Sequence, residues 1–369
     1  FRENISTKII SITGSCGKTT LKEMIGLTLK KLSRTTYSPK SFNNKYGVPL
    51  SLFNLKQNDE FGIFEVGMDR KGEIDYLTKI TKPDLGIITN ISYAHSKNFK
   101  SINQIATAKA EIMNNIKKDG VVILNSDDHF YNFHKNIAFK KKLKVISFGI
   151  KNKSSMIKLD KIKKIKNKYE LFINVGDLSV SFYSYNDNKS NLYNILATLA
   201  SISSYIDIKQ LKKNIFLNLK TPNGRGDISQ LKLKNKQIYL VDETYNSNPL
   251  SLKTAIENYD KIKLKNSKKY LILGDMLELG HKSEKFHKDL SKVINNSNID
   301  KVFIKGEKTL FTYKNLHKSK QGNILQNKDD IDLMLSSIIN NNDYLMIKGS
   351  NSTGLNTLSQ KMIKGFNVI

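Results

Sequence analysis

The stretch from Ile9 to Thr20 constrains the fold of this chain more than any other part of the sequence. A β-rich apolar run ends at Gly14, a second glycine follows at Gly17, and apolar residues then recur at helical spacing as far as Leu32. The pattern predicts a buried strand, a tight loop and an amphipathic helix. Glycines let backbone N–H groups turn toward an anion, and the helix N-terminus adds a positive dipole.

The loop therefore predicts a phosphate site of a nucleotide. In such loops a lysine (here Lys18) reaches the outer phosphates and a hydroxyl (here Thr19) is offered to Mg²⁺. The usual pattern has a further glycine where this chain has Ile12, so the match is to a shortened form, and Gly-Lys-Thr alone also occurs in ordinary turns. The strand before and the helix after favour the nucleotide interpretation, which assigns nucleotide binding to Gly14, Ser15, Cys16, Gly17, Lys18, Thr19 and Thr20.

Composition limits the class of protein. The 369 residues are enough for two or three domains, and no apolar run approaches the ~20 residues that span a bilayer. A single cysteine, Cys16, excludes an internal disulfide framework and fits a cytoplasmic protein. Cys16 is better explained as a small residue in a tight turn than as a nucleophile, since no base is identifiable beside it.

The formal net charge of +28 raises the question of nucleic-acid binding. The lysines are spread along the whole chain and no compact basic-aromatic motif appears, so we expect no nucleic-acid partner. A basic surface favours a polyanionic substrate instead.

Strands and helices alternate from residue 1 to about residue 149, which predicts a mostly parallel sheet covered on both faces. A hairpin follows at 169–175 and 178–183, then helices at 191–205 and 208–219. The sequence Thr221-Pro222-Asn223-Gly224 breaks the pattern and marks a domain boundary. We expect an α/β chain with a phosphate-loop nucleotide-binding domain at residues 1–220, which the resemblance described below makes an ATP-binding domain.

A second, smaller α/β unit of Rossmann type is expected at residues 221–369. Its predicted strands are 238–241, 270–273, 302–304 and 344–347, and its predicted helices are 250–259, 286–294, 331–339 and 357–363.

Polar side chains at predicted strand ends are candidates for chemistry, because ligands of parallel sheets collect there. In the first domain Glu65 ends an apolar strand, and His95 follows the strand that ends at Asn90. Lys109 lies among small residues on a helix, and its alternative is a surface lysine paired with Glu111. The pair Asn43-Asn44 predicts either a structured polar loop or a simple turn.

The second domain offers a similar set. Arg225 stands between two glycines and can present its planar fork to phosphate oxygens. Asp242 ends a strand and can accept hydrogen bonds from a ribose. Asn248 precedes a helix, for which N-capping is a complete explanation. His129, His134, His281, His287 and His317 show no metal-ligand spacing.

These motifs, in this order, resemble those of the Mur ligases, the ATP-dependent amide-forming enzymes of peptidoglycan precursor synthesis. The resemblance covers nearly the whole chain and is carried by residues 12–23, 42–49, 64–68, 108–112, 245–249 and 273–280. Within the family, Tyr-Asn-x-Asn-Pro and Gly-Asp-Met-Leu-Glu-Leu-Gly are typical of the branch that joins D-alanyl-D-alanine to UDP-N-acetylmuramoyl-tripeptide.

The resemblance implies ATP and two Mg²⁺ ions as cofactors, with a carbamylated lysine at Lys109. It implies a catalytic set of Lys18, Lys109, His95 and Glu65, and metal binding by Thr19, Glu65, His95 and Lys109. It further implies nucleotide contacts from Asn191, Asn194, Arg225 and Asp242, and substrate contacts from Asn43, Asn44, Tyr245, Asn246, Asn248 and Lys348.

The implied reaction is phosphorylation of a carboxylate followed by attack of an amine on the acyl phosphate. We expect a monomer without a membrane span. Two departures stand out: nothing corresponds to the N-terminal UDP-binding domain of the family, and Ser190 stands where a histidine is common. Another Mur-type ligase, folylpolyglutamate synthase, and a truncated ATP-binding module without ligase activity remain alternatives.

Overall fold

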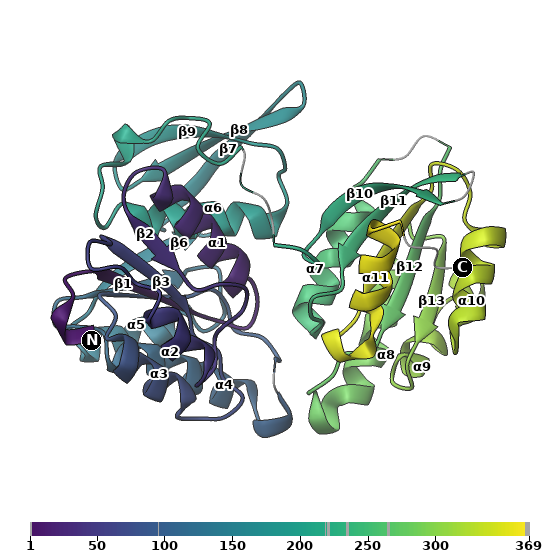
Figure 1. Cartoon of the computed structure of the whole chain (residues 1–369), viewed down its shortest axis with the longest axis horizontal. Helices are drawn as coiled ribbons and strands as arrows, with labels where there is room; N and C mark the ends of the chain where they lie inside the picture. Colours follow the sequence, from purple (N-terminus) through teal and green to yellow (C-terminus); the bar gives the residue numbers. More distant parts are fainter. Residues whose placement is uncertain are drawn as a thin grey trace. The chain divides into compact units, whose positions relative to one another are not determined.

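The computed structural model describes residues 2–94, 96–217, 219, 222–233, 236–263 and 266–365. The chain divides into two compact units, each described here by itself: Phe1–Ser92 with Asn98–Lys220, and Tyr93–Lys97 with Thr221–Ile369 (Figure 1). No helix in the described part of the chain combines the length and the apolar character that crossing a bilayer requires.

The first unit is built on a nine-stranded sheet with the order β2-β3-β1-β4-β5-β6-β7-β8-β9. Its strands as far as β7 run parallel, and β8 and β9 are added antiparallel. The strands are β1 (Lys8–Thr13), β2 (Thr35–Tyr37), β3 (Phe61–Glu65), β4 (Leu85–Ile88), β5 (Val121–Asn125), β6 (Lys144–Gly149), β7 (Ile157–Ile165), β8 (Lys168–Val175) and β9 (Leu178–Ser184).

Helices cover both faces of the parallel part of this sheet. Alternate side chains of β1 pack into two different cores, one on each face. Ile10 and Ile12 belong to the larger core, which α1 and α6 close, whereas Ile9 belongs to a smaller core with Leu52 at the end of α2. The helices of this unit are α1 (Lys18–Lys30), α2 (Gly47–Leu52), α3 (Glu73–Thr81), α4 (Ile102–Ala110), α5 (Tyr131–Lys140) and α6 (Lys189–Ile202).

The second unit has a six-stranded sheet with the order β10-β11-β15-β12-β13-β14, in which only the β10–β11 pair is antiparallel. Its strands are β10 (Asp227–Leu233), β11 (Lys236–Glu243), β12 (Lys269–Gly274), β13 (Lys301–Lys305), β14 (Gln321–Ile324) and β15 (Tyr344–Lys348). Its helices are α7 (Pro249–Asp260), α8 (Ser283–Asn295), α9 (Thr309–Tyr313), α10 (Lys328–Leu333) and α11 (Leu355–Ile363).

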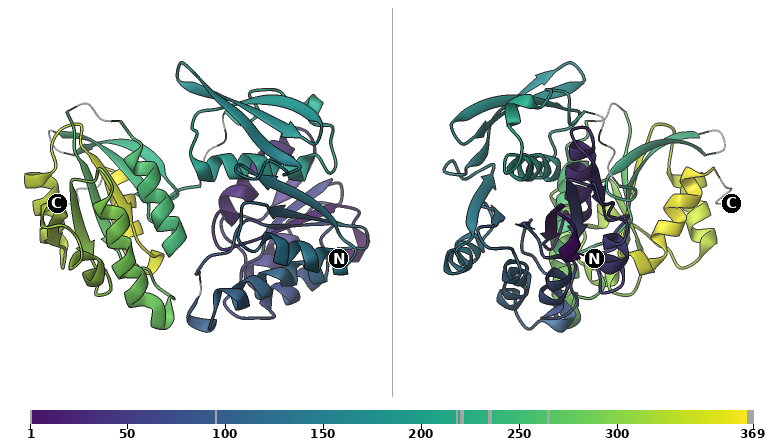
Figure 2. Two further views of the ribbon diagram at one scale, coloured as in Figure 1. Left: turned by 180° about the vertical axis from the view of Figure 1, so that it is seen from behind. Right: turned by 60° about the vertical axis from the view of Figure 1, so that its left-hand side comes forward.

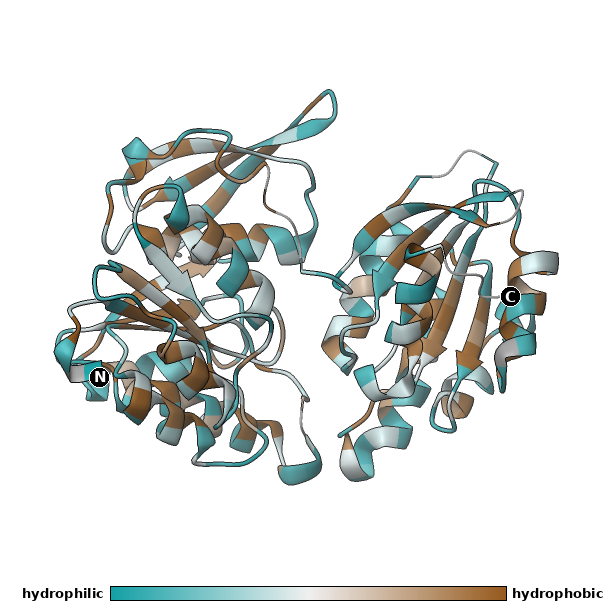
Figure 3. Cartoon of the chain, viewed as in Figure 1, coloured by the Kyte–Doolittle hydropathy of each residue, from teal (hydrophilic) through white to brown (hydrophobic). Residues whose placement is uncertain are grey.

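Both faces of the second sheet are buried under helices (Figure 2). Tyr270 and Ile272 of β12 pack with α11 and the α10 region on one face, and Leu271 and Leu273 pack with α7 and α8 on the other. Figure 3 shows the hydrophobic colour concentrated along the strands of this sheet. A strand buried on both faces is continuously apolar, so these strands are readily predicted from sequence.

The expected fold class, a mostly parallel α/β unit followed by a smaller one, is confirmed. The predicted helix at 208–219 is wrong. A 3-10 turn occupies Ile208–Gln210, and Leu211 is extended. Leu211, Ile215 and Phe216 are buried in the larger core of the first unit, so their helix-like spacing comes from an irregular segment anchored at several points.

Four strands were not predicted: β2, β7, β10 and β14. Three of them are edge strands, which pair on one side only and need not be apolar. β7 is internal, but charged residues, mostly lysines, fill its exposed positions and obscure its alternation.

Candidate functional site

The loop between β1 and α1 is tied to the end of β4. The backbone N–H of Cys16 donates to Asn90 Oδ1 (3.0 Å), and Thr89 Oγ1 donates to the Cys16 carbonyl (2.6 Å). Gly17 caps α1 with a left-handed φ of 83°, a conformation that favours glycine. These bonds fix the loop before any ligand arrives, as a preorganised anion site requires.

Two lysines converge on this loop from different helices. Lys18 Nζ donates to the Gly14 carbonyl at 2.9 Å, and Lys109 Nζ, from the last turn of α4, donates to the same carbonyl at 3.0 Å. Lys109 is 1% exposed, so the alternative of a surface lysine is wrong. Glu111 instead accepts hydrogen bonds from the backbone of Gly72 and Asp75.

Burial lowers the pKa of the Lys109 ammonium well below its usual range, and the charge of Lys18 lowers that pKa further. Glu65 and Cys16 act in the opposite direction. The amine of Lys109 is therefore much easier to deprotonate than that of an exposed lysine.

A carboxylate and a hydroxyl meet beside the start of α1. Thr19 Oγ1 donates to Glu65 Oε2 at 2.7 Å, because β1 and β3 are parallel neighbours and Glu65 ends β3 opposite Ile12. Asn43 Nδ2 donates to the other carboxylate oxygen of Glu65, also at 2.7 Å. Glu65 is buried, and these two bonds hold its carboxylate in place.

Oxygen donors of this kind fit Mg²⁺, which is usually held by one or two carboxylates together with phosphate oxygens and water. Thr19 and Glu65 are the described side chains that would hold it. Among the described residues, no group of three or more His, Cys, Asp or Glu side chains could hold a metal ion. His95, expected as a further ligand, lies outside the described residues.

The three remaining asparagine candidates of the first unit do not form one cluster. Asn194 is buried near the loop: a Cβ on Gly17 would lie 3.6 Å from its Oδ1. Asn191 donates to Ser184 Oγ (2.9 Å). Asn44 Oδ1 accepts from the backbone of Tyr46 and Gly47, which is the turn role that the sequence left open.

Sequence reasoning missed Ser41. Its hydroxyl lies 2.9 Å from Thr19 Oγ1, so it joins the Thr19–Glu65 pair. Ser41 directly precedes the motif at residues 42–49, and that position is the only sequence signal that could have drawn attention to it.

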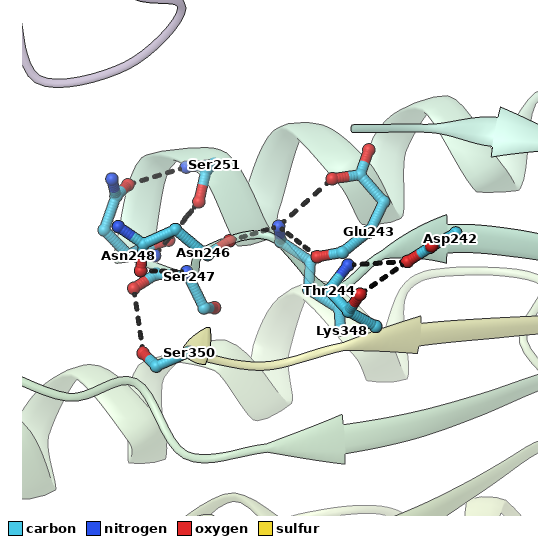
Figure 4. Close-up of polar contacts among 9 residues, drawn as sticks. All are labelled: Asp242, Glu243, Thr244, Asn246, Ser247, Asn248, Ser251, Lys348 and Ser350. Carbon is cyan, nitrogen blue, oxygen red and sulfur yellow. Dashed lines mark hydrogen bonds and ion pairs between the residues drawn. The ribbon is translucent and has the colours of Figure 1, made fainter. Parts of the chain in front are cut away.

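In the second unit the candidates gather where β11 and β15 end (Figure 4). Lys348 is 1% exposed; its Nζ lies 3.2 Å from Glu243 Oε2 and donates to the Asn246 carbonyl at 3.1 Å. Asp242 is also buried, and its Oδ1 accepts hydrogen bonds from the backbone (3.0 Å) and the hydroxyl (2.6 Å) of Thr244.

The loop from Tyr245 to Asn248 is held at both ends. Asn248 forms a capping box with Ser251 at the start of α7, so its predicted N-capping role is present. At the other end the Arg225 guanidinium lies over the Tyr245 ring, 4.1 Å from its centroid. Stacking of this kind orients the planar fork of an arginine.

Comparison with known proteins adds to this geometry. Residues 12–202 match the Mur ligase middle domain, and residues 228–351 match the domain described as Mur ligase, glutamate ligase domain. A UDP-N-acetylmuramoyl-tripeptide–D-alanyl-D-alanine ligase from Buchnera aphidicola is 32% identical over 98% of this chain and 78% of its own length. This chain belongs to the Mur ligase family.

Other relatives of this Mur ligase agree. The ligase of the same name from Bacillus subtilis is 29% identical over 99% of this chain and 78% of its own length. The crystal structure of MurF from Acinetobacter baumannii superposes with a TM-score of 0.84 at 25% identity, covering 98% of this chain and 78% of that one.

Proposed function

We propose that this Mur ligase joins D-alanyl-D-alanine to UDP-N-acetylmuramoyl-tripeptide, with conversion of ATP to ADP and phosphate, in peptidoglycan precursor synthesis. One observation carries the proposal: the similarity to ligases of that name extends over nearly the whole chain, including the phosphate loop and the strand-end residues. The proposal assigns ATP binding to residues 1–220 and a Mur ligase C-terminal domain to residues 221–369.

The phosphate loop is proposed to bind the ATP phosphates. Its backbone N–H groups and the start of α1 attract the anion, and Lys18 offsets negative charge as the γ-phosphate is transferred. Asn194 and Asn191 are proposed to contact the adenine side, and Arg225 and Asp242 to contact phosphate and ribose. The burial of Asn194 near Gly17 supports its part of this assignment.

The peptide carboxylate is proposed to attack the γ-phosphorus, forming an acyl phosphate and releasing ADP. The amine of D-alanyl-D-alanine then attacks the acyl carbon. A C–N bond forms, the C–O bond to phosphate breaks, and the amine loses a proton to solvent. Phosphorylation is needed because a carboxylate is a poor acylating agent at neutral pH. Asn43, Asn44, Tyr245, Asn246, Asn248 and Lys348 are proposed to position the substrates.

Magnesium would neutralise charge on the phosphates when bound, with Thr19, Glu65 and His95 as proposed protein ligands, together with a carbamate on Lys109. Carbamylation forms a bond between Nζ and the carbon of CO₂, and the amine gives up a proton. It requires a neutral amine, and the lowered pKa of Lys109 supports it. The product is an anion whose oxygens suit a hard cation, where an ammonium would repel it.

The compartment and assembly state complete the proposal. We place the reaction in the cytoplasm, where ATP and UDP-linked precursors are available, and expect a monomer without a nucleic-acid partner. The acceptor and the dipeptide are the substrate partners.

The test is a phosphate-release assay on the purified chain with ATP, Mg²⁺ and the UDP-linked tripeptide. D-alanyl-D-alanine is expected to support turnover, and a diamino acid or glutamate is not. Lys18→Ala is expected to lower kcat by about a hundredfold or more. Turnover with glutamate instead would favour folylpolyglutamate synthase or another Mur-type reaction. ATP binding without phosphate release that depends on both acceptor and amine would leave an ATP-binding module.

A further inference from the structure

A second buried lysine lies beside the site, and the proposed reaction gives it no role. Lys22 is on α1, one turn after Lys18 and Thr19, and its side chain is 0% exposed. An ammonium is costly to bury unless its donors are satisfied. Lys22 Nζ donates to the carbonyls of Ser38 (2.5 Å) and Lys40 (2.6 Å), and lies 2.9 Å from Glu23 Oε1. Its three N–H groups thus have three acceptors.

Both carbonyls belong to residues 38–43, here termed the Ser38–Asn43 loop, which follows β2. This loop reaches the Thr19–Glu65 pair in two ways. Ser41 Oγ lies 2.9 Å from Thr19 Oγ1, and Asn43 Nδ2 donates to Glu65 Oε1 at 2.7 Å. The loop that Lys22 holds therefore carries the side chains that surround the candidate magnesium residues.

The conformation of the loop explains why it needs such support. Lys40 has a φ of 46°, in the left-handed region that is unfavourable for residues other than glycine. The Lys40 carbonyl is one of the two that Lys22 binds. A charge-assisted hydrogen bond to that carbonyl offsets the backbone cost and selects the conformation that presents Ser41 and Asn43.

We infer that Lys22 is a positioning residue of the nucleotide site: it orders the Ser38–Asn43 loop and, through Ser41 and Asn43, fixes Thr19 and Glu65 for the metal side of the bound nucleotide. The metal part of this inference rests on the proposed function. The ordering of the loop rests on the contacts alone.

Hydrogen exchange of the ligand-free protein tests the ordering. Lys22→Met keeps an unbranched side chain, one atom shorter, and removes its charge and its N–H donors. The amides of Ser38, Phe42 and Gly67, which donate to Ile63, Pro39 and Asn43, are expected to exchange about tenfold faster. Val122 to Leu124 in the middle of β5 serve as the reference and are expected to stay unchanged.

Lys31→Met is the matched control. Lys31 follows the same helix, and its Nζ donates to a backbone carbonyl, that of Ile215 (2.9 Å), far along the helix from the loop. In Lys31→Met the three amides of Ser38, Phe42 and Gly67 are expected to exchange at the wild-type rate. Equal acceleration at the loop and at β5 in Lys22→Met would mean a purely structural role and would overturn the inference, as would no acceleration at the loop.

Binding of ADP with and without Mg²⁺ supplies a readout that a structural role would not move. Lys22→Met is expected to weaken ADP binding about tenfold with Mg²⁺ and less than about twofold without it, because the loop acts on the metal side. Equal weakening under both conditions contradicts the inference. Lys40→Gly in the Lys22→Met protein is expected to restore part of the Mg²⁺-dependent affinity, since glycine accepts the left-handed conformation.

Lys22→Gln covers the case in which Lys22→Met does not fold. Its amide keeps donors for the carbonyls without the charge, so a smaller acceleration at Ser38 and Phe42 is expected. Wild-type exchange at these amides in folded Lys22→Gln protein overturns the inference. Neither measurement uses the acceptor or the dipeptide. A wild-type protein that binds ADP with Mg²⁺ but ligates nothing would therefore remove the proposed function and leave the role of Lys22 standing.

Discussion

At the scale of single residues, the candidate site is organised around one carbonyl oxygen. Lys18 and Lys109 both donate to Gly14 O, and Lys109 is almost fully buried. Two ammonium groups so close together would repel each other, and this repulsion adds to burial in lowering the pKa of Lys109. Conversion of one of them to an anion removes that repulsion, which is the physical argument for a carbamate on Lys109.

Lys109→Ala tests that argument. The variant is expected to lose activity by about a hundredfold or more, because the site loses an anionic group beside the phosphates. Short carboxylic acids are expected to restore part of the activity by supplying oxygen ligands. Ligation kinetics with and without added acetate measure the effect. A fully active alanine variant would rule out the carbamate role.

Gly14 allows the loop to approach β4 closely. Its φ is 142°, and a Cβ at this position would lie 1.8 Å from Thr89 Oγ1. Gly14→Ala is therefore expected to reduce the free energy of unfolding by about 3–5 kcal/mol through steric overlap and strain. Gly72→Ala is the matched control: its φ is 90°, but no atom lies within 4 Å of the added Cβ. It is expected to cost about 1 kcal/mol.

Denaturant unfolding of both variants measures the difference. Equal costs for Gly14→Ala and Gly72→Ala would mean that the loop can move away from Thr89, and that the close approach does not determine its conformation.

At the scale of elements, loops at strand ends carry the candidate residues, and helices behind them fix those loops. The loop after β12 is an example. His287 of α8 is fully buried; its Nε2 accepts from the backbone N–H of Met276 (3.0 Å), and its Nδ1 lies 2.8 Å from the Ser283 carbonyl. Accepting at Nε2 and donating at Nδ1 requires a neutral ring.

This arrangement predicts a pH dependence. Burial lowers the pKa of His287 below the ordinary value of 6.5, an effect that Lys308 increases and Asp275 opposes. The unfolded state therefore binds the proton first as pH falls. The contribution of the neutral ring is present above pH 6.5 and is lost as pH falls below it toward the lower folded pKa.

Thermal unfolding at about pH 7.5 and about pH 5.5 measures this contribution. His287→Gln is expected to be less stable at the higher pH and to lose less on acidification than wild type. His134, whose pKa burial also lowers, adds a pH dependence of the same sign in both proteins. His317→Gln, at an exposed position, is the control and is expected to behave as wild type. An unchanged pH dependence in His287→Gln would contradict the prediction.

At the scale of the whole molecule, the chain has a formal net charge of +28. Such a charge attracts anionic substrates from a distance, and dissolved salt weakens this attraction by screening it. We infer that attraction of anionic substrates is what this charge contributes to function.

Ionic strength tests this explanation. Raising KCl from about 0.05 M to about 0.3 M is expected to lower kcat/KM for ATP about two- to fivefold. D-alanyl-D-alanine, a zwitterion without net charge, serves as the internal control, and its kcat/KM is expected to change little. An equal decrease for both substrates would mean that salt acts on the protein and not on the approach of an anion.

The sequence by itself determined where the buried strands lie along the chain and the position of the phosphate loop. These features are local: a strand covered on both faces is mostly apolar, and glycine is the favoured residue where φ is left-handed, as at Gly17. Strands with an exposed face or a free edge, such as β7 and β10, carry no comparable signal, and the spacing of Ile208, Leu211 and Ile215 predicted a helix that is absent.

The tertiary structure decided which polar residues meet. Lys109 is 95 positions from Gly14 in the sequence. Ser41 reaches Thr19, and Lys22 reaches the carbonyls of Ser38 and Lys40, only because α1 packs against β2 and β3. Such contacts depend on the order of strands in the sheet and on the burial of charged groups. Neither property can be predicted from the residues adjacent in sequence. The burial that makes Lys109 a candidate for modification is likewise a property of the packed unit and not of the helix that carries it.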